Sequence, residues 1–377
     1  LVGSEMCIRD RKKIHRTLSL FTVAAMCTAL LCSCGKVPDS SQTDSSSKAA
    51  TTTTADTTAD TTTTGEASST ASATSAPDSS VSDSSSAVTD DTKTNGITPA
   101  MWKVTSPEGN TMVMLGSFHA LKDECYPLPE AVTNAYNNAD ILAVECDITS
   151  TSEDGEYMKN LMKQMLYNDN TKLSQHISEE AYSALQTYLG YWGMDISALE
   201  VYRPWAISST LDTLLIQDAD FDSEKGLDNY LLTTAHADGK EIYEVESVDF
   251  QMNLLINFSD DIYDLMFRSY EGETKESQKQ ALEDLYTAWK SGDIETFLEE
   301  DNEEELAGYT EEDKKIAEDY NNQMLYDRNK NMAKAAEDLM SQGKNVFYVV
   351  GAAHYAGEGG IIDLLEKDGY TAERVQY

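Results

Sequence analysis

Alternating apolar and polar residues predict a β-hairpin near residue 100. Two strand-like runs, residues 101–105 and 111–116, flank a turn rich in Pro, Gly and Asn. Residues 129–138 then place apolar side chains at helical spacing, and residues 140–147 form a short apolar run that ends in acids. A strand, a helix and a further strand in this order make a β-α-β unit, which favours a sheet with parallel pairing.

Residues 152–340 have mostly helical periodicity with long polar faces. We expect Gly190 and Gly226 to interrupt these helices, because glycine weakens a helix interior. Residues 227–237 predict a helix, and residues 240–247 predict a further strand.

Residues 271–319 are dense in Glu and Asp, yet apolar residues recur in them at helical intervals. This periodicity favours a solvated amphipathic helical region over an acidic interaction tail. The apolar positions are Leu282, Leu285, Trp289, Ile294, Phe297 and Leu298.

The clearest strand-helix element closes the chain. An apolar run over residues 345–354 leads into a glycine-rich turn and a helix over residues 361–367, and residues 372–377 are suited to a last edge strand. We therefore predict an α/β fold over residues 98–377, with a central mixed sheet, flanking helices and a large helical insertion, preceded by a disordered stalk.

Residues 11–33 have the layout of a secretory signal: a basic start, then an apolar core that is too short to span a bilayer. The segment Leu31-Cys-Ser-Cys34 resembles a bacterial lipobox, in which Cys34 receives lipid and anchors the protein to the membrane. An ordinary cleaved signal with a chance cysteine is the alternative. Residues 1–10 fit neither reading and look like translated sequencing adapter.

Residues 34–97 are almost entirely Ser, Thr, Ala and Asp. Such a segment buries too little apolar surface to offset its chain entropy, so it is expected to be a solvated linker. A β-rich threonine repeat is the weaker alternative, because apolar partners are missing. Signal, anchor and linker together predict an extracytoplasmic lipoprotein.

The net charge of −38 argues against nucleic acid as a partner, since such a surface repels phosphate backbones.

Cys125 and Cys146 are the only cysteines of the predicted domain. They lack Cys-x-x-Cys spacing, so a disulfide and two buried free thiols both stay open.

Two of the four histidines in the domain follow an apolar strand in the same way, as Gly116-Ser-Phe-His119 and Gly351-Ala-Ala-His354. At a glycine usage of about 7%, this coincidence has a chance of about 3%, so the repeated motif is informative. His176 and His236 lack the glycine and are expected at the surface.

Strands of an open α/β sheet deliver side chains to the crevice at their carboxyl ends, and glycine lets the backbone turn sharply there. His119 and His354, joined by Glu145 at the end of a third strand, would form a His₂-carboxylate cluster that suits a divalent metal with open positions. Glu145 is either a metal ligand or a general base. The structural alternative for each histidine is a hydrogen-bonded residue at a strand end.

At these residues the chain resembles the TraB/GumN family and, more distantly, the Tiki membrane-tethered metalloproteases. The resemblance implies a metallopeptidase site made by His119, Glu145 and His354, which uses Mn²⁺, Co²⁺ or Zn²⁺ on a peptide or protein substrate. Departures are small: Ser117-Phe118 follows the first glycine, and Val245-Glu-Ser replaces Leu-Glu-Thr. The matching segments are Leu115-Gly-Ser-Phe-His, Val144-Glu-Cys-Asp, Gly226-Leu-Asp, Glu244-Val-Glu-Ser with Gln251, Ala288-Trp-Lys-Ser-Gly-Asp, Asp327-Arg-Asn and Val350-Gly-Ala-Ala-His-Tyr-Ala-Gly.

Two further residues are candidates for supporting roles. Glu246 could orient a histidine, and Arg328 could bind a substrate carboxylate through its planar guanidinium; helix-surface ion pairing explains both equally well. The leading hypothesis is an extracytoplasmic metal-dependent hydrolase of peptide bonds. The alternative hypothesis is a non-catalytic lipoprotein that sequesters peptides. The third hypothesis is an ester hydrolase.

Overall fold

The computed structural model describes residues 96–149, 154–298 and 309–377. The chain divides into two units, one of which, Lys36–Asp90, lies outside the described residues. The predictions for residues 1–95, including the lipidation of Cys34, lie outside them as well. None of the helices in the described ranges is long and apolar enough to cross a membrane.

A six-stranded mixed sheet forms the centre of the fold, as predicted. Four strands run parallel in the order β4-β3-β5-β2, and β1 continues the sheet antiparallel to both β2 and β6. The predicted hairpin is the β1-β2 pair. The strands are β1 Met101–Thr105, β2 Thr111–Ser117, β3 Ile141–Val144, β4 Glu241–Glu244, β5 Val346–Gly351 and β6 Thr371–Arg374.

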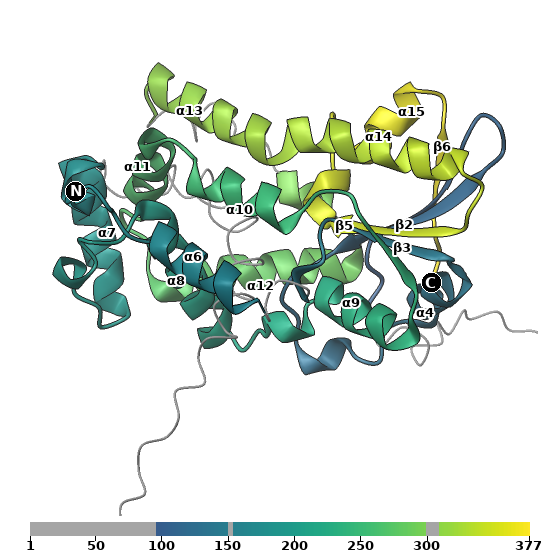
Figure 1. The fold of residues 1–377 in the computed structure, drawn as a ribbon, viewed down its shortest axis with the longest axis horizontal. Coiled ribbons are helices and arrows are strands. Elements are labelled where there is room, and N and C mark those ends of the chain that lie inside the picture. The colour runs from purple at the N-terminus through teal and green to yellow at the C-terminus, as the bar shows by residue number, and fades with distance from the viewer. Residues whose placement is uncertain (1–95, 150–153, 299–308) are drawn as a thin grey trace, which may run out of the picture. The chain divides into compact units, whose positions relative to one another are not determined.

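Helices cover both faces of this sheet (Figure 1). On one side lie α4 (Glu130–Asn138) and α9 (Leu227–Asp238), which are joined by a hydrogen bond from Tyr136 Oη to Asp238 Oδ2 of 2.9 Å. On the other side lie α14 (Asp327–Ser341) and α15 (Ile361–Lys367). Every residue of β3 and β5 is consequently buried, as expected for parallel strands covered on both faces.

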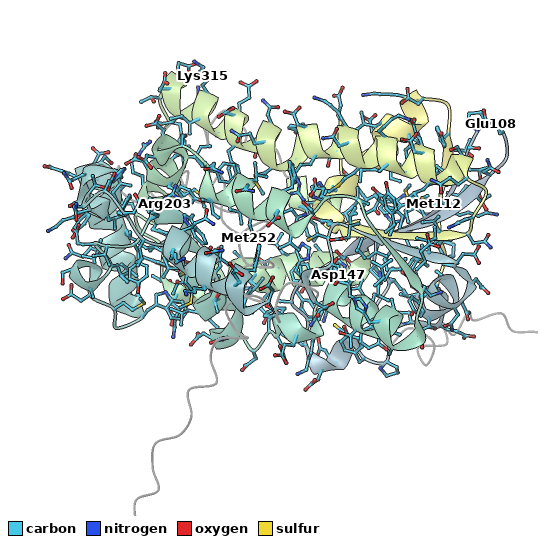
Figure 2. All side chains as sticks on the ribbon, in the orientation of Figure 1. Glu108, Met112, Asp147, Arg203, Met252 and Lys315 are labelled. Atoms are coloured by element: carbon cyan, nitrogen blue, oxygen red, sulfur yellow. The ribbon has the colours of Figure 1, made fainter. Side chains whose placement is uncertain are left out.

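The predicted helical insertion lies beside the sheet and connects β3, β4 and β5 (Figure 1). Met112 on β2 and Met252 in the insertion are buried, whereas Glu108 and Lys315 lie at the surface (Figure 2). A π-helical turn, Asn322–Tyr326, joins α13 to α14. The insertion contains α6 Gly155–Gln164, α7 Glu179–Tyr191, α8 Pro204–Asp218, α10 Val248–Ile256, α11 Asp260–Arg268, α12 Lys275–Ser291 and α13 Glu311–Asn321.

The acidic region, where it is described, forms amphipathic helices. Leu282, Leu285 and Trp289 of α12 are buried, and so are Ile294 and Phe297 just after it. This confirms the helical interpretation of that stretch. The two domain cysteines, Cys125 and Cys146, are buried free thiols, so they form no disulfide.

The two glycines that were expected to interrupt helices behave differently. Gly226 directly precedes α9, as predicted. Gly190 lies inside α7, and the helix ends after Tyr191, so the prediction for Gly190 was wrong. The left-handed turn is supplied by Gly193 instead, at φ +68°. Tertiary packing of α7 outweighs the modest cost of one glycine in its last turn.

The substitution Gly190→Ala is therefore expected to raise the free energy of unfolding by about 0.5 to 1 kcal/mol, because alanine loses less backbone entropy in a helix and a Cβ there meets no atom within 4 Å. Gly193→Ala has the same open space but a positive φ, so it should destabilise the protein. Urea unfolding of both variants tests this, and a loss of stability in Gly190→Ala would contradict it.

Candidate active site

Three neighbouring parallel strands bring the predicted residues to one edge of the sheet. His119 lies two residues beyond β2, Glu145 directly follows β3, and His354 lies in a 3₁₀ turn, η8 (Ala352–Tyr355), directly after β5. Because β5 pairs with both β2 and β3, its end lies between the other two. The apolar strand pattern thus determines where these side chains emerge.

Gly351 lies at the point where the three side chains meet. A Cβ placed on it would lie 3.1 Å from Glu145 Oε1, 3.5 Å from His119 Nε2 and 3.6 Å from His354 Cδ2. Its amide donates a hydrogen bond of 2.7 Å to Glu145 Oε1. Any larger side chain would therefore occupy the space between these three side chains.

The first turn of α9 makes an equally close approach to His119. A Cβ on Gly226 would lie 2.0 Å from the His119 carbonyl oxygen, so glycine is required there. Leu227 N–H donates to the Phe118 carbonyl at 3.0 Å, which brings the next residue, Asp228, to the histidine.

The two histidines of the site, His119 and His354, are each oriented through Nδ1. His119 Nδ1 lies 2.7 Å from Asp228 Oδ2, and His354 Nδ1 lies 2.6 Å from Asn329 Oδ1. Neither Nε2 makes a hydrogen bond with any of the residues that the structure describes. His354 Nε2 lies 3.8 Å from Glu145 Oε1. Both rings therefore keep one nitrogen for a ligand.

The two imidazoles differ in protonation because their partners differ. Removal from water opposes the charged form of His119, but the Asp228 carboxylate outweighs this and raises the pKa of His119 to about 9. The Asn329 amide is neutral. Burial and the charge of Arg328 therefore lower the pKa of His354 to about 3. At neutral pH His354 keeps a free lone pair.

Glu145 is a buried carboxylate held by three donors. Its Oε2 accepts hydrogen bonds from Gln251 Nε2 at 2.9 Å and from Arg328 at 2.7 Å, and its Oε1 accepts the one from Gly351. Burial opposes its charge, but Arg328 and the two histidines outweigh burial and lower the pKa of Glu145 to about 2. The carboxylate is therefore ionised across the physiological range.

The two supporting candidates lie together behind Glu145. Arg328 has only 4% of its side chain exposed and bridges Glu145 and Glu246, so it is not a helix-surface residue. Glu246 contacts Arg328 and Gln251. The histidines are oriented instead by Asp228 and Asn329, which our interpretation of the sequence left without a role although both belong to the quoted Gly-Leu-Asp and Asp-Arg-Asn segments.

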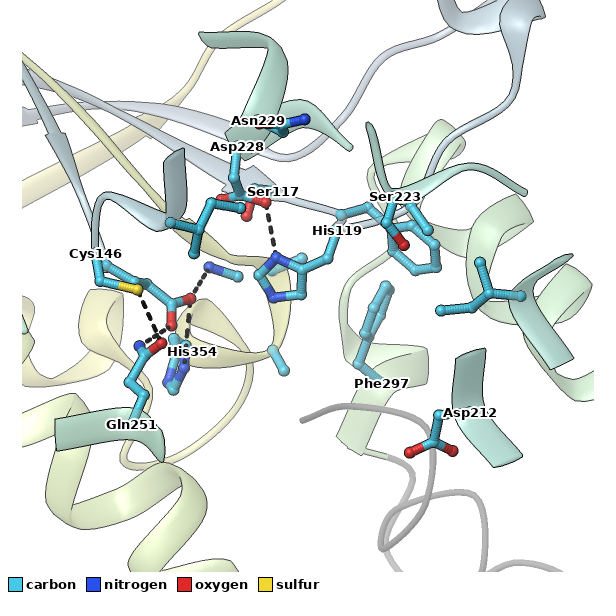
Figure 3. Close-up of a pocket in the computed structure, with 18 of the residues that line it drawn as sticks. Ser117, His119, Cys146, Asp212, Ser223, Asp228, Asn229, Gln251, Phe297 and His354 are labelled. Carbon is cyan, nitrogen blue, oxygen red and sulfur yellow. Dashed lines mark hydrogen bonds and ion pairs between the residues drawn. The ribbon is translucent and has the colours of Figure 1, made fainter. Parts of the chain in front are cut away.

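His119, Glu145 and His354 line a pocket of about 100 Å³ whose walls are otherwise largely apolar (Figure 3). His176 and His236 are not among its lining residues. Each contacts a carboxylate elsewhere, Asp260 for His176 and Asp147 for His236.

The side chains fit a divalent ion in chemistry and orientation. Imidazole nitrogens and a carboxylate are ordinary ligands for such an ion, and metal-ligating histidines commonly bind an oxygen through their second nitrogen, as His119 and His354 do. However, no group of three His, Cys, Asp or Glu side chains within residues 96–149, 154–298 and 309–377 is arranged so that it could hold a metal. Ion binding would have to draw the donors closer together.

Comparison with known proteins finds relatives that share part of this sequence. "Uncharacterized protein YbaP" of Escherichia coli (strain K12) is 26% identical over 157 residues, covering 42% of this chain and 56% of the relative. A "Metalloprotease TIKI homolog" of Nematostella vectensis is 24% identical over 293 residues, covering 66% and 61%. "Metalloprotease TIKI1" of Xenopus tropicalis is 26% identical over 161 residues, covering 38% and 32%.

The chain thus spans less than two thirds of the length of each of these relatives. No solved structure matches the chain. The sequence model of the TraB/PrgY/gumN family matches residues 100–374, which include the whole sheet and all three residues around Gly351. The chain therefore belongs to the TraB/PrgY/gumN family.

Proposed function

We propose that the protein is an extracytoplasmic metal-dependent hydrolase of peptide bonds. One observation carries the proposal: two histidines with their Nδ1 atoms engaged turn their Nε2 atoms toward a carboxylate around Gly351, inside a pocket. The relatives named as metalloproteases support the same reaction class.

In this proposal, His119, His354 and Glu145 are the metal ligands. A bound Mn²⁺, Co²⁺ or Zn²⁺ would supply Lewis acidity toward a substrate carbonyl. His354 is neutral at physiological pH and ready to coordinate, whereas His119 must release its proton first. The apolar walls of the pocket would displace water from around a bound substrate.

Glu145 suits the role of ligand better than that of general base. Its anion is stabilised by Arg328, Gln251 and the Gly351 amide, and a carboxylate stabilised in this way is a weak proton acceptor at neutral pH. Its Oε1 faces the histidines. This oxygen accepts one hydrogen bond, from the Gly351 amide, and has a further lone pair that could bind an ion.

The test is cleavage of a peptide library by the full-length protein, with added Mn²⁺, Co²⁺ or Zn²⁺ and with or without chelator. We expect metal-dependent cleavage and near-stoichiometric metal in protein purified without chelator. Metal-bound protein that cleaves no peptide would contradict the peptidase assignment. Protein that retains none of these metals would contradict the metal site.

We further propose that a lipid on Cys34 anchors the protein to the membrane. We expect Cys34→Ala to release the protein from the membrane fraction, because several buried acyl chains at about 0.8 kcal/mol per CH₂ group would be lost. Cell fractionation with an antibody to the protein measures this, and Cys32→Ala is the matched control. Unchanged membrane association of Cys34→Ala would rule out the anchor.

A further inference from the structure

A second buried carboxylate, Asp212, lines the same pocket. It belongs to α8 and is the only charged residue in the stretch 204–216. The residue is 4% exposed, and its Oδ2 has no hydrogen-bond partner among the residues that the structure describes. Figure 3 shows it on the side of the pocket away from Gln251 and Cys146.

A buried carboxyl oxygen without a partner is costly, so packing alone does not explain Asp212. Burial raises its pKa well above the usual range, and no neighbouring charge is found in the described part of the chain to offset this. A cation brought into the pocket would supply the missing partner.

The pocket between Asp212 and the histidines suits an aliphatic chain. Leu215, Ile216, Leu282, Phe297 and Leu325 are among its apolar lining residues. A volume of about 100 Å³ is sufficient for a single aliphatic side chain. The walls are apolar, and the Asp212 carboxyl lies apart from the histidines and Glu145 (Figure 3). This arrangement matches a methylene stem that ends in a positive charge. The net charge of −38 also favours the approach of cations.

We propose that Asp212 is a specificity-determining residue that binds the ammonium or guanidinium group of a lysine or arginine side chain of the substrate. The identity of the substrate as a peptide rests on the proposed function. The cation site itself rests only on the pocket and on the unpartnered carboxylate.

The kinetic test uses the full-length protein and two peptides that differ at one position, lysine in one and norleucine in the other. Norleucine keeps the aliphatic stem and lacks the charge. We expect kcat/KM to favour lysine by about 10-fold or more, since the coupling of a close, desolvated charge pair corresponds to at least that ratio. The preference should fall close to unity in Asp212→Asn. Asp218→Asn, the same change on the same helix outside the pocket, should keep it.

A binding test separates this proposal from the proposed function. Calorimetry with n-pentylammonium and with neutral 1-pentanol should show preferential binding of the cation to the wild type, lost in Asp212→Asn and kept in Asp218→Asn. If no peptide is cleaved, the peptidase assignment fails, and calorimetry alone decides the cation site. Equal binding of both probes, or an unchanged lysine preference in Asp212→Asn, would overturn the proposal. Because Asp212 makes no hydrogen bond through Oδ2, Asp212→Asn should melt no lower than the wild type.

Discussion

Either His119→Ala or His354→Ala is expected to abolish metal retention and peptide hydrolysis while leaving the fold largely intact. Each histidine offers one Nε2 that makes no hydrogen bond in the described part of the chain, so removing it takes away one ligand of a small set. The lost Nδ1 contact should cost only about 1 to 3 kcal/mol of stability. The double variant should be little worse than either single one, because residues that act as a unit are strongly non-additive.

Elemental analysis, peptide cleavage and thermal unfolding of the same preparations measure these effects. His176→Ala is a matched control: its Nδ1 lies 2.7 Å from a carboxylate, as in His119, but its Nε2 already contacts Thr171 Oγ1 at 2.8 Å. The His176→Ala variant should keep both metal and activity.

Asp228→Asn should lower metal affinity by about 10- to 100-fold, a smaller effect than that of His119→Ala. Full metal occupancy in both alanine variants would end the metal-site hypothesis.

Glu145→Gln adds a third comparison in the same assays. A ligand role predicts lower metal affinity together with lower activity. Retention of the full complement of metal with no hydrolysis would instead assign Glu145 as the general base.

The sheet and the meeting point of His119, Glu145 and His354 could be predicted because each follows a local signal. Parallel strands buried on both faces have continuous apolar runs, and their carboxyl ends lie at one edge by the geometry of the fold. The Gly-x-x-His spacing then marks which strand ends deliver imidazoles. Strands β3 and β5 were anticipated on this basis, and β1 and β2 from the alternating pattern and turn of a hairpin.

The partners of the site residues could not be predicted in the same way. Asp228 orients His119 across 109 positions of sequence, and Arg328 reaches Glu145 across 183. Helical periodicity identifies the buried face of a helix, but it does not determine which strand end a given polar side chain meets. Asp212 did carry a local signal, as the one charge in an apolar helical stretch. That stretch was interpreted only as part of a helical region with polar faces.

Arg328→Met is expected to destabilise the protein by about 3 to 5 kcal/mol at neutral pH, because it leaves buried carboxylates without their counter-charge. Arg328 donates to Glu145 at 2.7 Å and to Glu246 at 2.9 Å, and the side chains of both acids are at most 10% exposed. Methionine fills a similar volume, so the measured loss of stability reflects the missing charge more than altered packing. Urea unfolding at several pH values measures it.

The stability that the Arg328–Glu145 pair contributes depends on pH in a definite direction. In the wild type the pKa of Glu145 is lowered to about 2, below its value of about 4.3 in an unfolded chain, so the pair contributes stability above about pH 4 that is lost as the pH falls toward 2. Without Arg328, burial raises the pKa of Glu145, and protonation relieves the unpaired charge. The difference in stability between wild type and variant should therefore be largest near pH 7 and shrink below about pH 5.

Arg268→Met is the matched control for burial. Arg268 also bridges two acids, Asp264 and Asp313, but 26% of its side chain is exposed, so water compensates for part of its loss and the cost should be smaller. Adding Glu246→Gln to Arg328→Met should restore part of the lost stability, because one of the two uncompensated charges disappears. If Arg328→Met costs no more than Arg268→Met, or if its cost does not change with pH, the guanidinium does not hold this cluster together through its charge.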